Sequence, residues 1–338
     1  MAAQPETIQS TPFGTVFTRE MAICRFVDGA WTPCEIVPTA PISLHPGAHV
    51  LHYASACFEG LKAYRWADGS VRVFRPDRHI ERMQASTGLL CLPAPPAELL
   101  WAMIEQAIDA CREEIPTTPG SLYIRPTLIG TDTNIGAAGT GSDNACLYVL
   151  MSPVGDYFQG GARALRILIE DQHMRTAADF GSVKAGANYA AALHHVVSAR
   201  HVHDADQVLF CPGGDVQETG ASNFMLLDDK QILTKPLNDA FLHGVTRDSL
   251  LQLAIDLGYR VVERDFTVAE LLDWVRLGEA ALSGTAAVLA GVGTFIHEGK
   301  ELAVRNGTIG PNTERLRKAL TDIQTGVAED RHGWLRSV

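Results

Sequence analysis

The stretch "GSVKAGANY", residues 181 to 189, is a run of glycines and other small residues that contains a single lysine. A lysine on a solvated surface usually has polar or charged neighbours, because its ammonium group points into water. Lys184 stands instead among residues without bulk, which leaves room for a flat ligand beside its amine. A lysine that reacts with a carbonyl group must be neutral part of the time, so it needs partial burial. From the residues alone, a lysine at a loop tip remains the alternative.

A helix is predicted directly after this stretch. The segment "NYAAALHHVVSARHV" has apolar residues at 189, 192, 193, 196 and 197, which is the spacing of one helix face. The histidines at 194, 195, 201 and 203 fit the exposed side and the end of this helix. Because no acidic helix motif such as HExxH accompanies them, the sequence predicts no metal site.

Strand-like runs and helical patterns alternate along the rest of the chain, which predicts a mixed α/β protein. The strands predicted at 207–210, 223–227 and 231–234 are expected to form a meander. The helix within 242–259 is expected to have Thr246 as its N-cap and to end at Gly258. An interruption at 151–162 separates a predicted first domain (1–153) from an interdomain loop (154–162) and a second domain (163–338). The predicted strands are 70–75, 121–130, 165–170, 207–210, 223–227 and 231–234, and the predicted helices are 77–90, 98–114, the one after Lys184 and the one within 242–259.

Composition limits the classes of function. The 338 residues are 46% hydrophobic and carry a net charge of −11, which suits two packed domains and argues against nucleic-acid or membrane partners. The uncharged window 280–296 is shorter than the roughly 18 to 20 residues of a membrane span, so it is expected in the core. The first twenty residues have no basic, apolar leader pattern, and the seven cysteines have no CxxC pair. We therefore expect a cytoplasmic protein with reduced thiols.

Three further stretches could carry chemistry. The loop "HGVT" before the helix at 246 would present backbone N–H groups to a phosphate. Glu218, in "DVQETGASN", is a carboxylate among small residues that could pair with a protonated ring nitrogen. The turn in "ALSGTAA", 281 to 287, could hold a carboxylate with its amides. Taken alone, the first stretch is also compatible with an ordinary helix start, the second with an ordinary acid in a turn, and the third with a buried turn.

Taken together, these stretches resemble the fold-type IV (class IV) pyridoxal-phosphate enzymes, and specifically the branched-chain amino acid aminotransferases. The resemblance extends from "FVDGAW" at 26 to "DRHGWL" near the end. Seven motifs occur in the order known for the family: "LHYASACFEGLKAYR" (51–65), "FRPDRHIERM" (74–83), "SLYIRP" (121–126), "KAGANY" (184–189), "ETGASN" (218–223), "LHGVTRDSL" (242–250) and "SGTAA" (283–287).

The resemblance implies roles in binding pyridoxal 5′-phosphate. Lys184 is similar to the catalytic lysine that binds this cofactor covalently and moves the substrate proton, and Glu218 is similar to the acid that pairs with the pyridine nitrogen. Tyr189 resembles the tyrosine that hydrogen-bonds the phenolic oxygen. The remaining matches are Arg82, the amides of Val245 and Thr246, and Thr285 as phosphate anchors, and Leu242 against the ring.

The resemblance also implies a substrate site. The backbone at Thr285 and Ala286 and the hydroxyl of Tyr123 match the site for the α-carboxylate. The side-chain pocket, formed by Phe58, Tyr53 and Arg125, would take a branched chain on an apolar wall and the second carboxylate of glutamate on a polar rim. The implied activity is ping-pong transamination of leucine, isoleucine and valine with 2-oxoglutarate.

The implied architecture has a smaller N-terminal α/β domain and a larger C-terminal, β-barrel-like domain with helices, with the active site at the domain interface of a homodimer. Within the same fold, the alternatives are a D-amino acid aminotransferase and an (R)-amine transaminase. The D-specific pattern has an arginine and a histidine two residues apart, whereas this chain has Arg125, Pro126 and Thr127. A non-catalytic binding protein of the same fold is the alternative from a different class.

Overall fold

The computed structural model describes residues 13–155 and 163–338, so most of the predicted interdomain loop (residues 156–162) lies outside the described residues. These residues form two compact units. The first contains residues 13–155, Val183–Ala187 and Ile323–Val338, and the second contains residues 163–182 and Asn188–Asp322. Residues 183–187 and 323–338, which the predicted boundary assigned to the second domain, therefore lie in the first unit.

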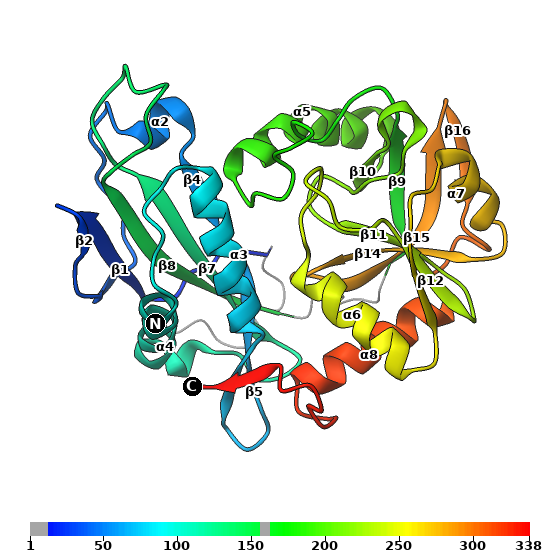
Figure 1. Cartoon of the computed structure of the whole chain (residues 1–338). Helices are drawn as coiled ribbons and strands as arrows, with labels where there is room; N and C mark the ends of the chain where they lie inside the picture. The colour runs from blue at the N-terminus through cyan, green and yellow to red at the C-terminus, as the bar shows by residue number, and fades with distance from the viewer. Residues whose placement is uncertain (1–12, 156–162) are drawn as a thin grey trace. The chain divides into compact units, whose positions relative to one another are not determined.

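The first unit is built on a nine-stranded sheet with the main order β17-β6-β5-β7-β8-β1-β2, while β3 pairs with β1 and β4 with β7. The helices α3 and α4 lie against this sheet (Figure 1). The elements are β1 (Glu20–Val27), β2 (Ala30–Trp31), β3 (Glu35–Pro38), α2 (His49–Tyr53), β4 (Ala56–Phe58), β5 (Leu61–Arg65), β6 (Val71–Phe74), α3 (Pro76–Leu89), α4 (Ala97–Ala110), the 3₁₀ turn η1 (Arg112–Glu114), β7 (Ser121–Gly130), β8 (Ala145–Val154) and β17 (Leu335–Ser337).

The core of this unit lies between α4 and the sheet. Leu100, Ile104 and Ile108 recur at helical spacing and are buried, and they join one cluster with strand residues such as Leu122 and Leu147. The long strands β7 and β8 pair over their whole length, from Ser121 opposite Val154 to Gly130 opposite Ala145. This rigid pair positions the polar side chains of β7 that were predicted to bind substrate.

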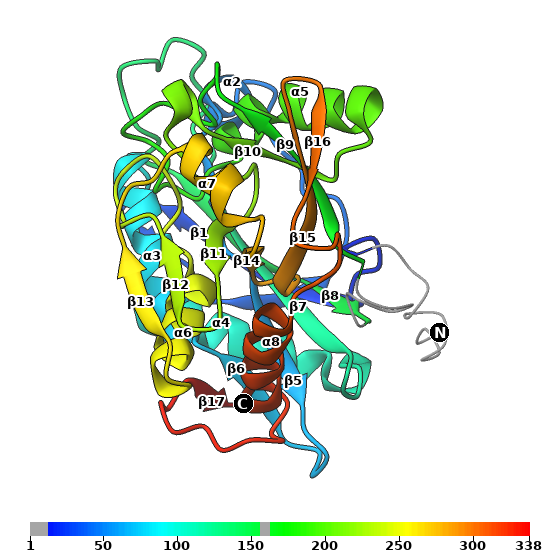
Figure 2. The same cartoon turned by 90° about the vertical axis from the view of Figure 1, so that its right-hand side faces the viewer.

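The second unit is built on an eight-stranded sheet with the main order β10-β9-β15-β14-β11-β12-β13, and β16 pairs with β15. Figure 2 shows the hairpin of β15 and β16. The elements are β9 (Leu165–Glu170), α5 (Gly186–His203, whose Gly186 and Ala187 belong to the first unit), β10 (Gln207–Phe210), the 3₁₀ turn η2 (Pro212–Gly214), β11 (Asn223–Leu227), β12 (Gln231–Thr234), α6 (Val245–Asp256), β13 (Arg260–Glu263), α7 (Val268–Trp274), β14 (Glu279–Gly284), β15 (Val288–His297), β16 (Lys300–Ala303) and α8 (Pro311–Gln324, whose Ile323 and Gln324 belong to the first unit).

The apolar window at 280–296 forms β14 and β15, which pair antiparallel in the middle of this sheet. Buried residues from both strands, among them Leu282 and Phe295, pack in one cluster with Phe224 and Phe266. Among the described residues, the structure has no helix long and apolar enough to cross a membrane.

The predicted fold class, a mixed α/β fold of the fold-type IV kind, is confirmed. Two local predictions are wrong. β10 does not form a meander with β11, because it pairs in parallel with β9 and lies at the edge of the sheet. Thr246 is not the N-cap of α6, because the helix already begins at Val245 after Gly244, which has an extended backbone and no side-chain cap.

Candidate active site

Two hydrogen bonds fix the backbone of Lys184, one at its N–H and one at its carbonyl. Its N–H donates to Ser86 Oγ of α3 at 3.1 Å, and its carbonyl accepts from the Phe58 N–H of β4, also at 3.1 Å. The next residue, Ala185, forms a bridge with Cys57. The segment thus adds to the edge of β4 like a short strand, and α5 begins two residues after the lysine, at Gly186. The lysine side chain is half-buried, as a reactive amine requires.

Phe58 lies beside this lysine within the first unit, Arg125 lies against Phe58, and Tyr123 is bound to Arg125. The Lys184 Nζ lies 5.1 Å from the Phe58 ring centroid, and the Arg125 guanidinium lies 4.5 Å from the same centroid. Arg125 Nη2 donates to Tyr123 Oη at 2.7 Å, as expected for residues two apart on one face of β7. The Arg125 Nε is buried without a hydrogen-bond partner. The arrangement combines an apolar ring with a positive charge.

Close approach of the backbone makes this cluster possible. Gly60 follows β4, and a Cβ at this position would lie 2.1 Å from Tyr123 Oη. Only glycine therefore leaves room for the tyrosine hydroxyl beside Arg125. Tyr53, the remaining residue predicted for the side-chain pocket, lies at the end of α2, where its hydroxyl donates to the carbonyl of Ile135.

Arg82 lies one turn before Ser86 on α3 and is oriented by a buried carboxylate. Its Nε and Nη2 donate to the two oxygens of Glu59, at 2.7 and 2.8 Å. His79 Nδ1 lies 2.7 Å from Glu59 Oε2. Burial by itself raises the pKa of the Glu59 carboxyl, but Arg82 and His79 outweigh it and hold this pKa well below its usual range. For His79, burial is the largest influence, and the pKa of its imidazole is lowered.

Glu218 is the corresponding buried carboxylate of the second unit, with an exposed fraction of 3%. Its Oε1 lies 2.7 Å from Arg175 Nη2 and accepts from the Leu242 N–H at 3.0 Å. Its Oε2 accepts from Asn223 Nδ2 at 2.9 Å. These contacts compensate the desolvation of the charge and fix the orientation of the carboxylate.

The loop from Leu242 to Thr246 is joined to this carboxylate. Asn223 Nδ2 also donates to the Leu242 carbonyl at 2.8 Å, so one amide links Glu218 to the loop. A Cβ on Gly244 would lie 2.0 Å from Asn223 Oδ1, which explains the glycine. The first-turn residues of α6, Val245 and Thr246, follow directly and are buried. Their amides stand at a helix N-terminus, a position that favours anions.

The turn with Thr285 and Ala286 follows the end of β14. Ser283, two residues before Thr285, is the register partner of Asn223 across β11 and β14, so this turn belongs to the same part of the unit as Glu218. The Ser283 hydroxyl is buried without a hydrogen-bond partner. Tyr189 lies in the first turn of α5 and is half-buried.

The structure therefore groups the predicted residues into two sets. In the first unit it brings together Lys184, Phe58, Tyr123 and Arg125, with Arg82 nearby on the helix that holds the lysine. In the second unit it joins Glu218 to Leu242 and to the loop that leads into α6.

Sequence reasoning missed the partners that orient these residues. Glu59 and Asn223 lie inside two of the seven motifs, but no role was predicted for either residue. Arg175 lies in "HMRTAADF", outside every motif, and only the fold places it on Glu218. A buried carboxylate needs a cationic partner, and that rule was the only signal that pointed to an arginine of this kind.

Comparisons with known proteins show which family the chain is similar to. Residues 56–294 match the family model for amino-transferase class IV. The chain is 38% identical to a probable branched-chain-amino-acid aminotransferase of Staphylococcus epidermidis, over 95% of this chain and 92% of the relative. It is 36% identical to the branched-chain-amino-acid aminotransferase of Mycolicibacterium smegmatis, over 98% and 93%. The crystal structure of the T.th. branched-chain amino acid aminotransferase with pyridoxamine 5′-phosphate superposes with a TM-score of 0.78 and 26% identity, over 95% of this chain and 99% of that chain.

The fold and the matched family define an aminotransferase of class IV, a class of pyridoxal-phosphate enzymes. Within that class the chain belongs to the branched-chain-amino-acid aminotransferase family, and the resemblance read from its motifs is confirmed.

Proposed function

We propose that this enzyme transfers the amino group of L-leucine, L-isoleucine and L-valine to 2-oxoglutarate, with pyridoxal 5′-phosphate as its cofactor. The observation that carries the proposal is the half-buried Lys184, fixed on both sides of its backbone, with an apolar ring and Arg125 beside it. The apolar ring suits a branched aliphatic chain, and the guanidinium suits the second carboxylate of glutamate and 2-oxoglutarate. The names of the aligned relatives support the same substrate class.

The residues present fit this cofactor. Arg125 Nε, Arg175 Nε and Ser283 Oγ are buried without a hydrogen-bond partner on or beside residues assigned to cofactor and substrate, and a ligand rich in acceptors would suit them. A phosphorylated pyridine that reacts with carboxylate substrates is such a ligand. The buried carboxylate of Glu218 can accept a hydrogen bond from a protonated ring nitrogen. In the bound state the cofactor supplies an electron sink for the charge that develops at the substrate Cα.

The proposed catalytic roles follow from charge and position. Lys184 would hold the cofactor covalently through its amine, and the same amine, once free, would take the proton from the substrate Cα and pass it to the cofactor. Glu218 keeps a proton on the ring nitrogen, and Arg175 and Asn223 hold its carboxylate in one orientation. Tyr189 donates to the phenolic oxygen.

The remaining cofactor contacts concern the phosphate and the ring. We assign the phosphate to Arg82, to the amides of Val245 and Thr246 and to Thr285. Glu59 supports the first of these contacts, because its bidentate ion pair fixes the Arg82 guanidinium. Leu242 packs against the ring.

The substrate contacts separate the two amino donors. Tyr123 and the backbone of Thr285 and Ala286 bind the α-carboxylate that all substrates share. Phe58 and Tyr53 accept the branched chain, and Arg125 accepts the second carboxylate. One pocket can thus take leucine and glutamate in turn, as a ping-pong reaction requires.

A donor screen with 2-oxoglutarate tests the substrate class. We expect L-leucine, L-isoleucine and L-valine to exceed D-leucine and (R)-1-phenylethylamine by at least about tenfold in kcat/KM, measured as glutamate formed. A preference for D-leucine or for the amine would favour the alternatives of the same fold. Absence of turnover with every donor, after saturation with pyridoxal 5′-phosphate, would favour a non-catalytic protein.

We also propose a homodimer in the cytoplasm. All seven cysteines are free, which fits a reducing compartment. The resemblance to the branched-chain aminotransferase family supports the homodimer. Light scattering on the purified protein tests this assignment, and a monomeric mass for the active enzyme would contradict it.

A further inference from the structure

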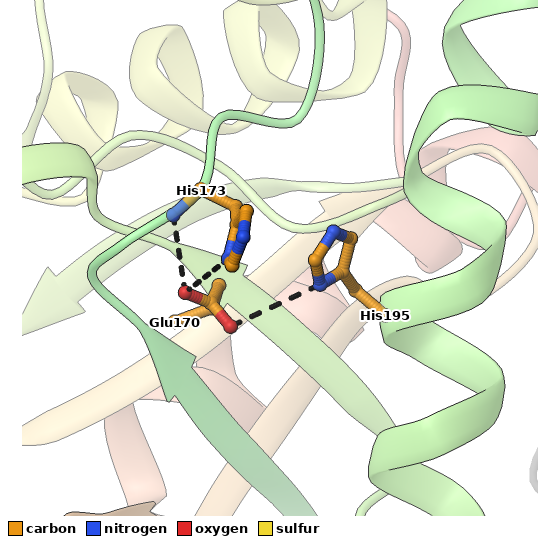
Figure 3. A group of neighbouring side chains, drawn as sticks. All are labelled: Glu170, His173 and His195. Carbon is orange, nitrogen blue, oxygen red and sulfur yellow. Dashed lines mark hydrogen bonds and ion pairs between the residues drawn. The ribbon is translucent and has the colours of Figure 1, made fainter.

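A cluster of one carboxylate and two imidazoles lies in the second unit, on elements that carry none of the residues assigned to substrate. Glu170 is the last residue of β9, His173 follows three residues later, and His195 projects from α5. Figure 3 shows the two rings and the carboxylate turned toward one another. The sequence predicted no metal site from the histidines of this helix, because Glu170 and His173 lie on a distant segment.

The packing of α5 explains why these residues meet. Ala192 and Ala199 of this helix pack with Val208 and Phe210 of β10, and β10 pairs in parallel with β9. This packing places His195, in the middle of α5, beside Glu170 at the carboxyl end of β9. The His195 ring rests edge-on against Phe210, with centroids 5.9 Å apart, which restricts its orientation.

The distances suit one shared cation. His173 Nδ1 lies 3.1 Å from Glu170 Oε1, and His195 Nδ1 lies 3.9 Å from Glu170 Oε2. The ligand atoms of all three residues lie within 4.8 Å of one another. Around a tetrahedral Zn²⁺ with bonds of about 2.1 Å, neighbouring ligand atoms are about 3.4 Å apart. Small side-chain rotations would therefore suffice to bring the three ligand atoms to these distances.

The cluster is open to an ion from solution. The side chain of His173 is 59% exposed, while those of His195 and Glu170 are 23% and 19% exposed. The three residues line a pocket of about 500 Å³ together with His194 and His203. The pocket thus has further imidazoles on its wall and space for water in the remaining coordination positions.

We propose that Glu170, His173 and His195 form a binding site for a divalent transition-metal cation of the Zn²⁺ class. Two imidazoles and one carboxylate match the preferences of Zn²⁺, Ni²⁺ and Cu²⁺. Mg²⁺ and Ca²⁺ prefer sites made of several oxygen ligands, and this group offers one carboxylate. The bound ion would tie the loop after β9 to α5.

Calorimetric titration of the EDTA-treated holoenzyme with Zn²⁺ tests the site. We expect one equivalent of Zn²⁺ to bind per chain, and the affinity to fall at least about tenfold in His173→Gln and in His195→Gln, because each variant loses a ligand. The matched control is His201→Gln, which lies on the same helix but does not line the pocket. A second control is Cys91→Ser, because Cys91 is the exposed thiol that could bind Zn²⁺ elsewhere.

Co²⁺ provides a second readout, since its visible ligand-field bands report nitrogen and oxygen ligation. We expect these bands in the wild type, in His201→Gln and in Cys91→Ser, and their loss in Glu170→Gln. The proposal is overturned if the wild type binds no Zn²⁺, if both histidine variants bind within about twofold of His201→Gln, or if Cys91→Ser abolishes binding.

Discussion

At the residue scale, two buried carboxylates orient the two sets of residues proposed for the active site. Glu59 holds Arg82 by a bidentate contact, and Arg175 holds Glu218. In both pairs a charge that would be costly to bury alone is compensated by a guanidinium. In the pair of Glu59 and Arg82, the group proposed to bind the cofactor is the arginine. In the pair of Arg175 and Glu218, the group proposed to bind the cofactor is the carboxylate. The same physical device therefore orients groups of opposite charge.

Arg125 is expected to separate the two half-reactions. Glutamate and 2-oxoglutarate have a second carboxylate, whereas leucine has none. Loss of a charge-assisted contact costs about 1.5 to 3 kcal/mol, or at least about tenfold in a rate ratio. In Arg125→Met, which keeps apolar bulk beside Phe58, we expect kcat/KM for glutamate to fall by this factor and kcat/KM for leucine to change far less. Stopped-flow measurement of each half-reaction provides the comparison, and an equal decrease in both would make Arg125 a structural residue or a shared α-carboxylate anchor.

Glu218→Gln should slow proton abstraction without loss of the cofactor. A neutral amide cannot keep the proton on the ring nitrogen, so we expect the single-turnover rate with L-leucine to fall by about 10² or more. Cofactor content, measured by absorbance after gel filtration, should stay close to that of the wild type. Asp215→Asn is a matched control, because Asp215 pairs with Lys235 elsewhere in the unit. A single-turnover rate equal to that of the control would show that Glu218 has no such role.

At the element scale, the sequence predicts the bounds of the strands better than it predicts which strands pair with one another in a sheet. The strands at 121–130, 165–170, 207–210, 223–227 and 231–234 have the observed bounds, because β-branched and aromatic runs end there at turn residues. Strand order depends on contacts between distant segments, which local patterns do not encode. The pairing of β10 with β9 was missed for this reason, as was the return of β17 to β6.

The candidate site shows the same difference between local patterns and contacts of distant segments. Unusual local composition and ordered motifs point to Lys184, Glu218 and the loop into α6, and their role in the site stays a prediction. Their partners were not predictable, since Arg175 and Ser86 are fixed on them only by packing and hydrogen bonds across the fold. The loop into α6 also depends on such a long-range contact, through Asn223.

Gly244→Ala tests this contact. The new Cβ would lie 2.0 Å from Asn223 Oδ1, so the amide must move away from Glu218 and Leu242. We expect the free energy of unfolding to fall by about 1 to 3 kcal/mol, and the enzyme to retain less cofactor. The control is Gly88→Ala in α3, where a Cβ meets open space and alanine should stabilise the helix by about 0.5 to 1 kcal/mol. Cofactor retention in Gly244→Ala equal to that in Gly88→Ala would contradict this account.

At the scale of the whole molecule, charge and burial set the response to pH. The chain carries a net charge of −11, and one of its most deeply buried carboxylates is Glu59. Its pKa lies below the ordinary value of 4.5 because Arg82 and His79 outweigh the opposing effect of burial. A group with a lowered folded pKa contributes stability that is present above its unfolded pKa and is lost as the pH falls through the folded pKa.

We therefore expect the free energy of unfolding to decrease more steeply in the wild type than in Glu59→Gln as the pH falls from about 5 to about 3. Urea titrations across this range supply the measurement. Glu113→Gln, which removes an exposed carboxyl on η1, should keep the slope of the wild type. Equal slopes for all three proteins would show that the Glu59 network does not couple folding to pH.

Lys184 is the residue proposed to move the Cα proton of branched-chain L-amino acids. Proton NMR of the holoenzyme with L-leucine in D₂O, without 2-oxoglutarate, follows this step as loss of the Cα–H signal. We expect rapid loss with L-leucine, little with D-leucine, and a rate at least about 10²-fold lower in Lys184→Ala, because a positioned base contributes about 10² to 10⁴. Exchange of L-leucine by Lys184→Ala at the wild-type rate, or faster exchange of D-leucine by the wild type, would contradict the account.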